Sequence, residues 1–240
     1  MRLRLDSIAS SESSSAIGFK NTAQEFGSTA VGRDKVATGF DSNAVGRGNT
    51  SNGASSSAVG GSNSADGGIS NAFGTDNTAS GFVSSAFGSS NNASGDNSSA
   101  FGLGNNANGN RSVAIGANNT VSADMSIAMG RSNTANGLFS SALGMSNIAD
   151  QGSAIGINNR SSAIGSNAVG DGNLALDGFS NAFGTQNTAS GAQSSAFGAG
   201  NVASANKSVA IGAENLASGD QSIAIGTGNI VTGDRSGAIG

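Results

Sequence analysis

Residues 75–88 read TDNTASGFVSSAFG and residues 213–226 read AENLASGDQSIAIG, and these two stretches carry the pattern that decides the fold. Both end on Ser-x-Ala-Φ-Gly, in which Φ is one bulky apolar residue. This pentapeptide occurs seventeen times between residues 14 and 240, once with Gly152 in place of the serine. Its closing glycines are 14 residues apart, except for one step of 12. A short, fixed period indicates one small unit that stacks on copies of itself. Such a chain has little sequence left for a single catalytic site.

The composition supports a repeat protein without catalytic or nucleic-acid-binding chemistry. Apolar residues make up 36% of the chain and recur at fixed positions with no proline between them, which argues against disorder. Histidine and cysteine are absent, so Ser-His and Cys-His nucleophiles and most zinc sites are excluded. The net charge of −4 includes no basic stripe for nucleic acid, and no apolar run approaches the length of a membrane span. We predict a chain that is not an enzyme, has no cofactor or metal, and does not insert into a membrane.

Each 14-residue unit predicts two short strands and two tight turns. Counted up to the closing glycine, the twelfth position is always Ala and the fifth is usually Ala; the third is Asn except at Lys35. Glycine enters the left-handed region without a Cβ penalty, and asparagine is the next best residue there. The glycines and the third-position Asn are therefore expected to form left-handed turns, with the Asn amides stacked along the repeat. Each strand then lies parallel to its copy one unit later, about 4.8 Å away.

Side chains alternate across a strand, which separates the small residues of the unit from the large ones. An alanine that never varies indicates a place where nothing larger fits, so we assign the fifth and twelfth positions to the inside of a narrow coil. The Φ residues then form an apolar ridge on an outer face, and such a ridge marks an interface. We expect it to join parallel, in-register copies of the chain in a homo-oligomer. The ridge consists of Val31, Val45, Val59, Phe73, Phe87, Phe101, Ile115, Met129, Leu143, Ile155, Val169, Phe183, Phe197, Ile211, Ile225 and Ile239.

Apolar residues also occur at the eighth and ninth positions of several units, in an expected turn. Two interpretations remain open for them. They either dock a ligand or extend the interface between neighbouring chains. The aromatic candidates for a ligand-facing role are Phe26, Phe40, Phe82, Phe139 and Phe179.

The pattern is irregular between residues 145 and 170. The unit from Met145 to Gly156 lacks two residues at its second turn, and the next unit holds an extra pentapeptide, Ser161–Gly165, directly before the usual one. The irregularity is either a modified loop that presents a binding surface or an indel tolerated between duplicated blocks.

Several copies of the pentapeptide resemble a known repeat. Residues 111–116 (RSVAIG), 207–212 (KSVAIG) and 221–226 (QSIAIG) are similar to the core of the 14-residue head repeat of YadA-like trimeric autotransporter adhesins. This resemblance covers residues 14–240, preceded by a lead-in at residues 1–13. It implies an all-β, left-handed parallel β-roll of 14-residue coils and a homotrimer. It also implies an adhesive role at the bacterial cell surface, with a host matrix protein or cell-surface receptor as partner.

The sequence also departs from complete members of that family. No signal peptide, neck, coiled-coil stalk or membrane barrel is visible in it. We therefore expect either an extracellular adhesin head anchored in the outer membrane through other segments, or a structural or receptor-binding fibre segment of a phage or virion. An ice-binding face would need a regular threonine ladder, and the threonines at the fourth position are too irregular for one.

Overall fold

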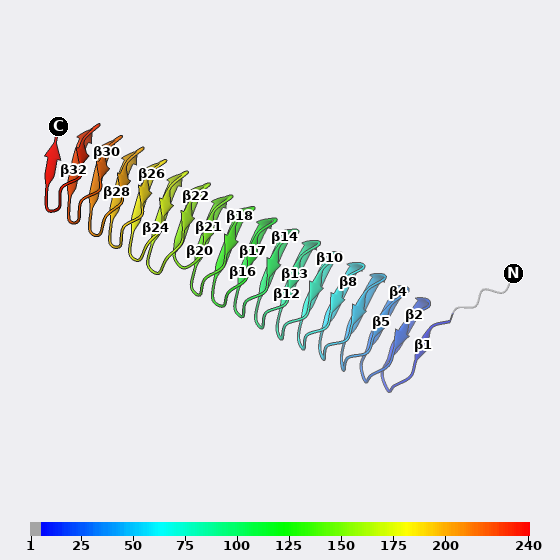
Figure 1. Ribbon diagram of the computed structural model, residues 1–240. Helices are drawn as coiled ribbons and strands as arrows, with labels where there is room; N and C mark the ends of the chain where they lie inside the picture. The colour runs from blue at the N-terminus through cyan, green and yellow to red at the C-terminus, as the bar shows by residue number, and fades with distance from the viewer. Residues whose placement is uncertain (1–5) are drawn as a thin grey trace. The chain divides into compact units, whose positions relative to one another are not determined.

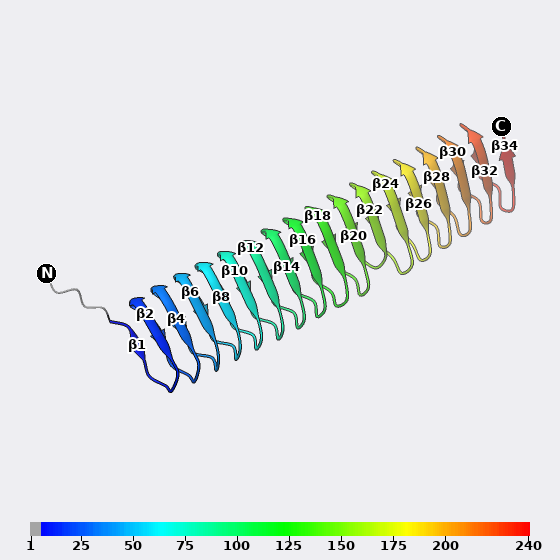
Figure 2. The ribbon, with the colours of Figure 1, turned by 180° about the vertical axis from the view of Figure 1, so that it is seen from behind.

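The computed structural model describes residues 6–240, and every regular element in this part of the chain is a β-strand. The chain forms two units, one up to Asp124 and one from Met125 to Gly240. In each unit, short odd-numbered strands and longer even-numbered strands alternate along a stack of coils (Figure 1). Figure 2 shows the even-numbered strands side by side from behind.

In the first unit the short strands have two residues and the long strands have five. The short strands are β1 (Ile8–Ala9), β3 (Thr22–Ala23), β5 (Val36–Ala37), β7 (Thr50–Ser51), β9 (Ser64–Ala65), β11 (Thr78–Ala79), β13 (Asn92–Ala93), β15 (Asn106–Ala107) and β17 (Thr120–Val121). The long strands are β2 (Ser15–Phe19), β4 (Thr29–Arg33), β6 (Asn43–Arg47), β8 (Ser57–Gly61), β10 (Asn71–Thr75), β12 (Ser85–Ser89), β14 (Ser99–Leu103) and β16 (Val113–Ala117).

The second unit repeats the same alternation, and its last strand is shorter. The long strands are β18 (Ile127–Arg131), β20 (Ser141–Met145), β22 (Ser153–Ile157), β24 (Asn167–Asp171), β26 (Asn181–Thr185), β28 (Ser195–Ala199), β30 (Val209–Ala213), β32 (Ile223–Thr227) and β34 (Gly237–Ile239). The short strands are β19 (Thr134–Ala135), β21 (Ile148–Ala149), β23 (Arg160–Ser161), β25 (Leu174–Ala175), β27 (Thr188–Ala189), β29 (Val202–Ala203), β31 (Leu216–Ala217) and β33 (Ile230–Val231).

Within each unit, each strand pairs in parallel with the equivalent strand of the next coil, in a register of one repeat. Phe87 of β12, for example, lies between Phe73 of β10 and Phe101 of β14. Pairing begins before residue 14, because Ile8 of β1 pairs with Thr22 of β3; residues 1–5 of the expected lead-in lie outside the described residues. The predicted all-β parallel solenoid of about 14-residue coils is confirmed. The left-handed sense of the coil and the trimer stay predictions.

The interior of each coil is very narrow. Ala79 and Ala86, at the fifth and twelfth positions, have no exposed surface, and the same is true of nearly all equivalent residues. Ser84 and Asn77 of the same coil are equally buried, whereas Phe87 points outward and is half-buried. The predicted assignment of the small residues to the inside is therefore confirmed.

The third-position asparagines form a buried amide ladder within each unit. The Asn91 amide nitrogen lies 3.0 Å from the Phe87 carbonyl oxygen, 2.8 Å from that of Gly102 and 2.9 Å from Asn77 Oδ1. Asn91 Oδ1 in turn accepts hydrogen bonds from the backbone and side-chain nitrogens of Asn105, both at 3.0 Å. Every polar atom of the buried side chain thus has a partner, as burial requires. The predicted stacking of amides is confirmed.

The predicted left-handed turn at these asparagines is wrong. Positive φ angles occur instead at the second and ninth positions, such as Asp76 (φ 55°) and even the β-branched Val83 (φ 56°). Branched residues rarely adopt this conformation. It is held here because the Val83 N–H donates to the Gly68 carbonyl oxygen of the preceding coil at 2.8 Å. A hydrogen bond between coils therefore outweighs the local preference of the residue.

The repeated glycines are needed mainly because neighbouring coils approach each other closely. A Cβ atom on Gly88 would lie 2.1 Å from the Gly102 carbonyl oxygen, and one on Gly81 would lie 2.0 Å from that of Gly95. Gly88 lies within β12 with a φ of +119°, and Gly81 has no positive φ at all. The predicted positive φ is confirmed at Gly88, although this residue lies in a strand and not in a turn. At Gly81 the prediction is wrong, since only the lack of a side chain is required there.

The irregular zone contains one shortened coil and no insertion. In the coil of β21 and β22, Asp150, Gln151 and Gly152 replace the usual five turn residues, so that the eighth and ninth positions are missing. The strand register is kept, since Ile155 pairs with both Leu143 and Val169. Residues 161–165, predicted as an extra pentapeptide, fill the fifth to ninth positions of a regular 14-residue coil. That prediction is wrong because a sequence match does not show which turn the residues occupy.

Lys35 replaces asparagine in the ladder of the first unit and is fully buried. Its Nζ donates to the Arg33 carbonyl oxygen at 2.9 Å. Burial lowers the Lys35 pKa from 10.5 to about 8; Asp34 opposes this shift and Arg47 adds to it. The folded chain therefore binds this proton less tightly than the unfolded chain does.

We predict that Lys35→Asn stabilises the protein. A pKa difference of this size destabilises the folded chain by about 3 kcal/mol at neutral pH. At this pH Lys35 is protonated in both the folded and the unfolded chain, and the folded chain holds the charge in its interior. The stability of the wild type should be lowest below pH 8 and rise as the pH increases from 8 to 10.5. Lys35→Asn should raise the free energy of unfolding in urea at pH 7 and remove this rise. Equal pH dependence in the two proteins would contradict the prediction.

Candidate functional site

The outer face of the long strands carries the Φ residues in one row within each unit. The rings of Phe73, Phe87 and Phe101 stack with centroids 4.9 and 5.2 Å apart, and Phe183 and Phe197 stack at 5.3 Å. None of the predicted interface residues lies inside its own coil. Those half-buried in the single chain are Val31, Val59, Phe73, Phe87, Phe101, Ile115, Leu143, Val169, Phe183 and Ile225. Those more exposed are Val45, Met129, Ile155, Phe197, Ile211 and Ile239.

Further apolar residues on this face were missed in the sequence. The long strand continues one residue beyond the closing glycine, so the first position of the next unit points outward beside the Φ row. Leu103, Met145 and Ile157 occupy this position and are exposed. These residues could have been identified in the sequence as apolar residues directly after a closing glycine. They were missed because a turn was expected at this position, and the strand in fact continues through it.

The aromatic residues of the eighth and ninth positions lie at the turn between each short strand and the following long strand. All five candidates, Phe26, Phe40, Phe82, Phe139 and Phe179, are exposed in the single chain. Phe26 and Phe40 stack with their ring centroids 5.4 Å apart. These turns form an edge of the coil, distinct from the outer face of the long strands.

A hollow of about 350 Å³ opens in the turn edge of the second unit, where the coil of residues 145–156 is short. Leu138, Phe139, Gln151 and Ile164 line it, and we call it the notch. Leu138 and Phe139 come from the turn before the short coil, and Ile164 comes from the turn after it. The three apolar side chains are 54%, 66% and 64% exposed. The two missing residues therefore leave an apolar gap between neighbouring turns.

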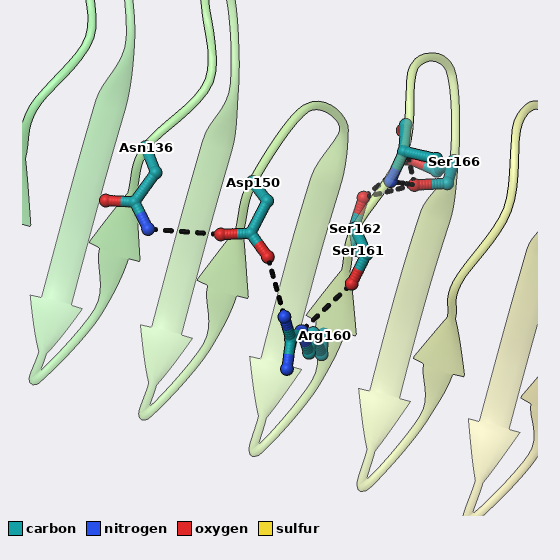
Figure 3. A network of polar contacts seen from close by, with 7 residues as sticks. Asn136, Asp150, Arg160, Ser161, Ser162 and Ser166 are labelled. Atoms are coloured by element: carbon teal, nitrogen blue, oxygen red, sulfur yellow. Dashed lines mark hydrogen bonds and ion pairs between the residues drawn. The ribbon is translucent and has the colours of Figure 1, made fainter.

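Polar contacts fix the short turn to the coils on both sides (Figure 3). Asn136 Nδ2 donates to Asp150 Oδ1 at 3.0 Å, and the Arg160 guanidinium contacts Asp150 Oδ2 at 3.1 Å. Arg160 Nε also donates to Ser162 Oγ at 2.9 Å. Exposed ion pairs contribute little stability on their own. Together these contacts link the short turn to the coil before it and the coil after it.

The interior under the notch is adapted to the short turn. A Cβ atom on Gly152 would lie 2.1 Å from the Ser166 carbonyl oxygen and 2.2 Å from Ser161 Oγ, so serine, usual at this position, does not fit. Ser161 replaces the usual alanine, and its Oγ lies 2.7 Å from Ser166 Oγ (Figure 3). Ser51 and Ser56 make the same contact at 2.6 Å in a coil with regular turns, so the serine pair is not specific to the short turn.

The rest of the described chain offers no alternative kind of site. Residues 6–240 contain no group of three or more acidic side chains placed to hold a metal ion. No helix in this part of the chain is long and apolar enough to cross a membrane. Its two ion pairs, Arg33–Asp34 and Asp150–Arg160, are both at the surface.

Comparison with known proteins places much of the chain in a family of repeats. A family model described as YadA head domain repeat (2 copies) matches residues 9–34, 79–105, 93–119, 122–147, 180–201, 189–215 and 217–240, which together make up more than half of the chain. No curated protein matches the chain.

Proposed function

Because the chain belongs to the family of YadA head domain repeats, we propose that it is the head of a surface adhesin and attaches a bacterium to host matrix or host cells. Members of this family are non-enzymatic repeats of trimeric autotransporter adhesins, and their heads are homotrimers at the outer-membrane surface. The resemblance seen in the sequence is confirmed by this match, and the family agrees with the prediction that the chain is not an enzyme.

The observation that carries the proposed assembly is the outward row of Φ side chains. Full burial of one such side chain contributes about 1.5–3 kcal/mol, and each unit leaves a row of them half-buried or exposed on one face. The interior cannot take them, because alanine already fills it. Two further copies of the chain in parallel register would bury equivalent rows against one another around a common axis. The first-position residues, such as Leu103 and Ile157, would add to the same interface.

The adhesive surface would then be the part of each coil that the sister chains leave free. In this arrangement the turn-edge aromatics Phe26, Phe40, Phe82, Phe139 and Phe179 are candidates for contact with the host, and their exposure in the single chain supports this role. We place the head outside the cell, held at the outer membrane by other parts of the adhesin.

We predict a mass in solution of three times the chain's 23.0 kDa. Phe87→Asp and Phe197→Asp should each lower it toward one chain and lower the melting temperature, because three carboxylates would meet at the shared interface. Thr78→Asp, on the outer face of the short strands, is the matched control and should leave the trimer intact. Light scattering on the purified chain measures this. Wild-type mass and melting temperature in both phenylalanine variants would contradict the proposed interface.

We further predict that the wild-type trimer binds at least one immobilised matrix protein from a panel of collagen, fibronectin and laminin. Saturable binding in a plate assay, weakened in the dissociated Phe87→Asp variant by loss of multivalency, is the expected result. Failure of the intact trimer to bind any matrix protein or the surface of cultured host cells would refute the adhesive function.

A further inference from the structure

The notch lacks the backbone of one turn as well as its side chains. In regular coils the ninth residue donates its backbone N–H to the eighth residue of the preceding coil; Phe179 N, for example, donates to the Ile164 carbonyl oxygen at 2.9 Å. The short coil has neither position. The Leu138 carbonyl oxygen and the Gly165 N–H therefore have no hydrogen-bond partner within residues 6–240. The notch thus presents one backbone acceptor on one wall and one backbone donor on the other.

The width of the gap suits a polypeptide. Neighbouring coils are spaced by about 4.8 Å, so the turns that flank the short coil are separated by roughly 10 Å, twice the spacing between paired strands. A single segment of backbone placed between them lies within hydrogen-bonding distance of both. Such a segment would replace the missing turn of the ladder, in the way that an added strand completes a sheet edge.

The walls and floor define the side chain that this segment would carry. Leu138, Phe139 and Ile164 form apolar walls, and Gln151 also lines the hollow. The Gln151 side-chain amide has no hydrogen-bond partner within the described residues. A tyrosine combines an apolar ring for the walls with a hydroxyl group for the amide, and buried tyrosine hydroxyls usually find such partners. The volume of about 350 Å³ is within the range of binding pockets.

We propose that the notch binds a loop of a partner protein, with a tyrosine ring between Phe139 and Ile164 and the loop backbone between Leu138 and Gly165. The chain contains no tyrosine, so this residue comes from another protein and not from a second copy. The polar contacts of Asp150 hold the short turn in place before the partner arrives, which lowers the ordering cost of binding. The inference rests on the proposed adhesive function and names the chemistry of one contact.

The absence of tyrosine and tryptophan from the chain makes a direct test simple. The probe is the peptide acetyl-Gly-Gly-Tyr-Gly-Gly-amide, whose fluorescence is the only tyrosine signal in the mixture. Its anisotropy should rise saturably as full-length wild-type protein is added. The same peptide with phenylalanine should compete more weakly, and the alanine peptide should not compete. No saturable rise, or equal competition by the alanine peptide, would overturn the proposal.

Two variants locate the site. Replacement of Asp150 and Gln151 by the sequence of residues 190–193 keeps Gly152, restores a full turn and should weaken peptide binding at least tenfold, about 1.4 kcal/mol, because the gap is filled. Ile164→Ser should weaken it to a similar extent by removing one wall. Phe82→Ser changes an exposed residue at the same position of a regular coil and should leave binding unchanged. Circular dichroism and light scattering check that each variant is folded and assembled.

The remaining outcomes separate this inference from the proposed function. If the restored-turn variant binds the peptide as tightly as the wild type does, the notch is not the binding site and the proposal is overturned. A change in the mass of the assembly on restoring the turn would show that a second copy fills the notch, and would also overturn it. Matrix binding without peptide binding would leave the adhesive function intact and refute only the proposed binding of a tyrosine loop in the notch. Peptide binding without any binding to matrix or host cells would refute the adhesive function and leave the notch as a peptide-binding site.

Discussion

The width of the coil interior is the constraint on which the rest of the structure depends. Two sheets lie so close that the methyl groups of residues such as Ala79 and Ala86, with small hydroxyl groups and asparagine amides, fill most of the space between them; Lys35 and Val121 are the largest side chains buried there. A single coil therefore has almost no hydrophobic core of its own. Its stability comes from neighbouring coils, through strand pairing and the amide ladder, as in other solenoid proteins. The larger apolar side chains are forced to the outside, where only another molecule can bury them, and this links the fold to assembly and adhesion.

The same closeness explains why the repeat varies so little. Gly81 and Gly88 leave no space for a Cβ atom, and each third-position asparagine satisfies carbonyl groups from its own coil and the next. A change at any of these positions affects two coils at once. Lys35 is the exception in the ladder, and its lowered pKa shows that a cationic side chain fits this interior poorly. In the short coil, Gly152 replaces the usual serine because a Cβ atom there would lie 2.2 Å from Ser161 Oγ of the next coil.

The sequence was sufficient to predict the solenoid, its parallel register and the inward or outward direction of the residues in each pentapeptide, because strict alternation fixes Ala86 inside once Phe87 is outside. The turns were not predictable from residue preferences. Val83 adopts a left-handed conformation because its N–H bonds to the preceding coil, and Gly81 is required by a close approach between coils that one repeat does not reveal. The outward Leu103 was missed because the strand extends past the glycine. The notch depends on three successive coils, so the missing residues alone could not define its walls.

These features divide the surface of the coil into parts with different tasks. The face of the long strands offers an apolar row suited to sister chains, and the turn edge offers isolated aromatics and one preformed notch suited to a foreign protein. The apolar row exists because the interior excludes large side chains, whereas the notch exists because one coil lacks two turn residues. The most direct test of that exclusion compares urea unfolding of Ala86→Leu with that of Phe87→Leu. The narrow interior predicts a loss of roughly 3 kcal/mol for Ala86→Leu and a clearly smaller loss for Phe87→Leu. An Ala86→Leu protein as stable as the wild type would contradict the account.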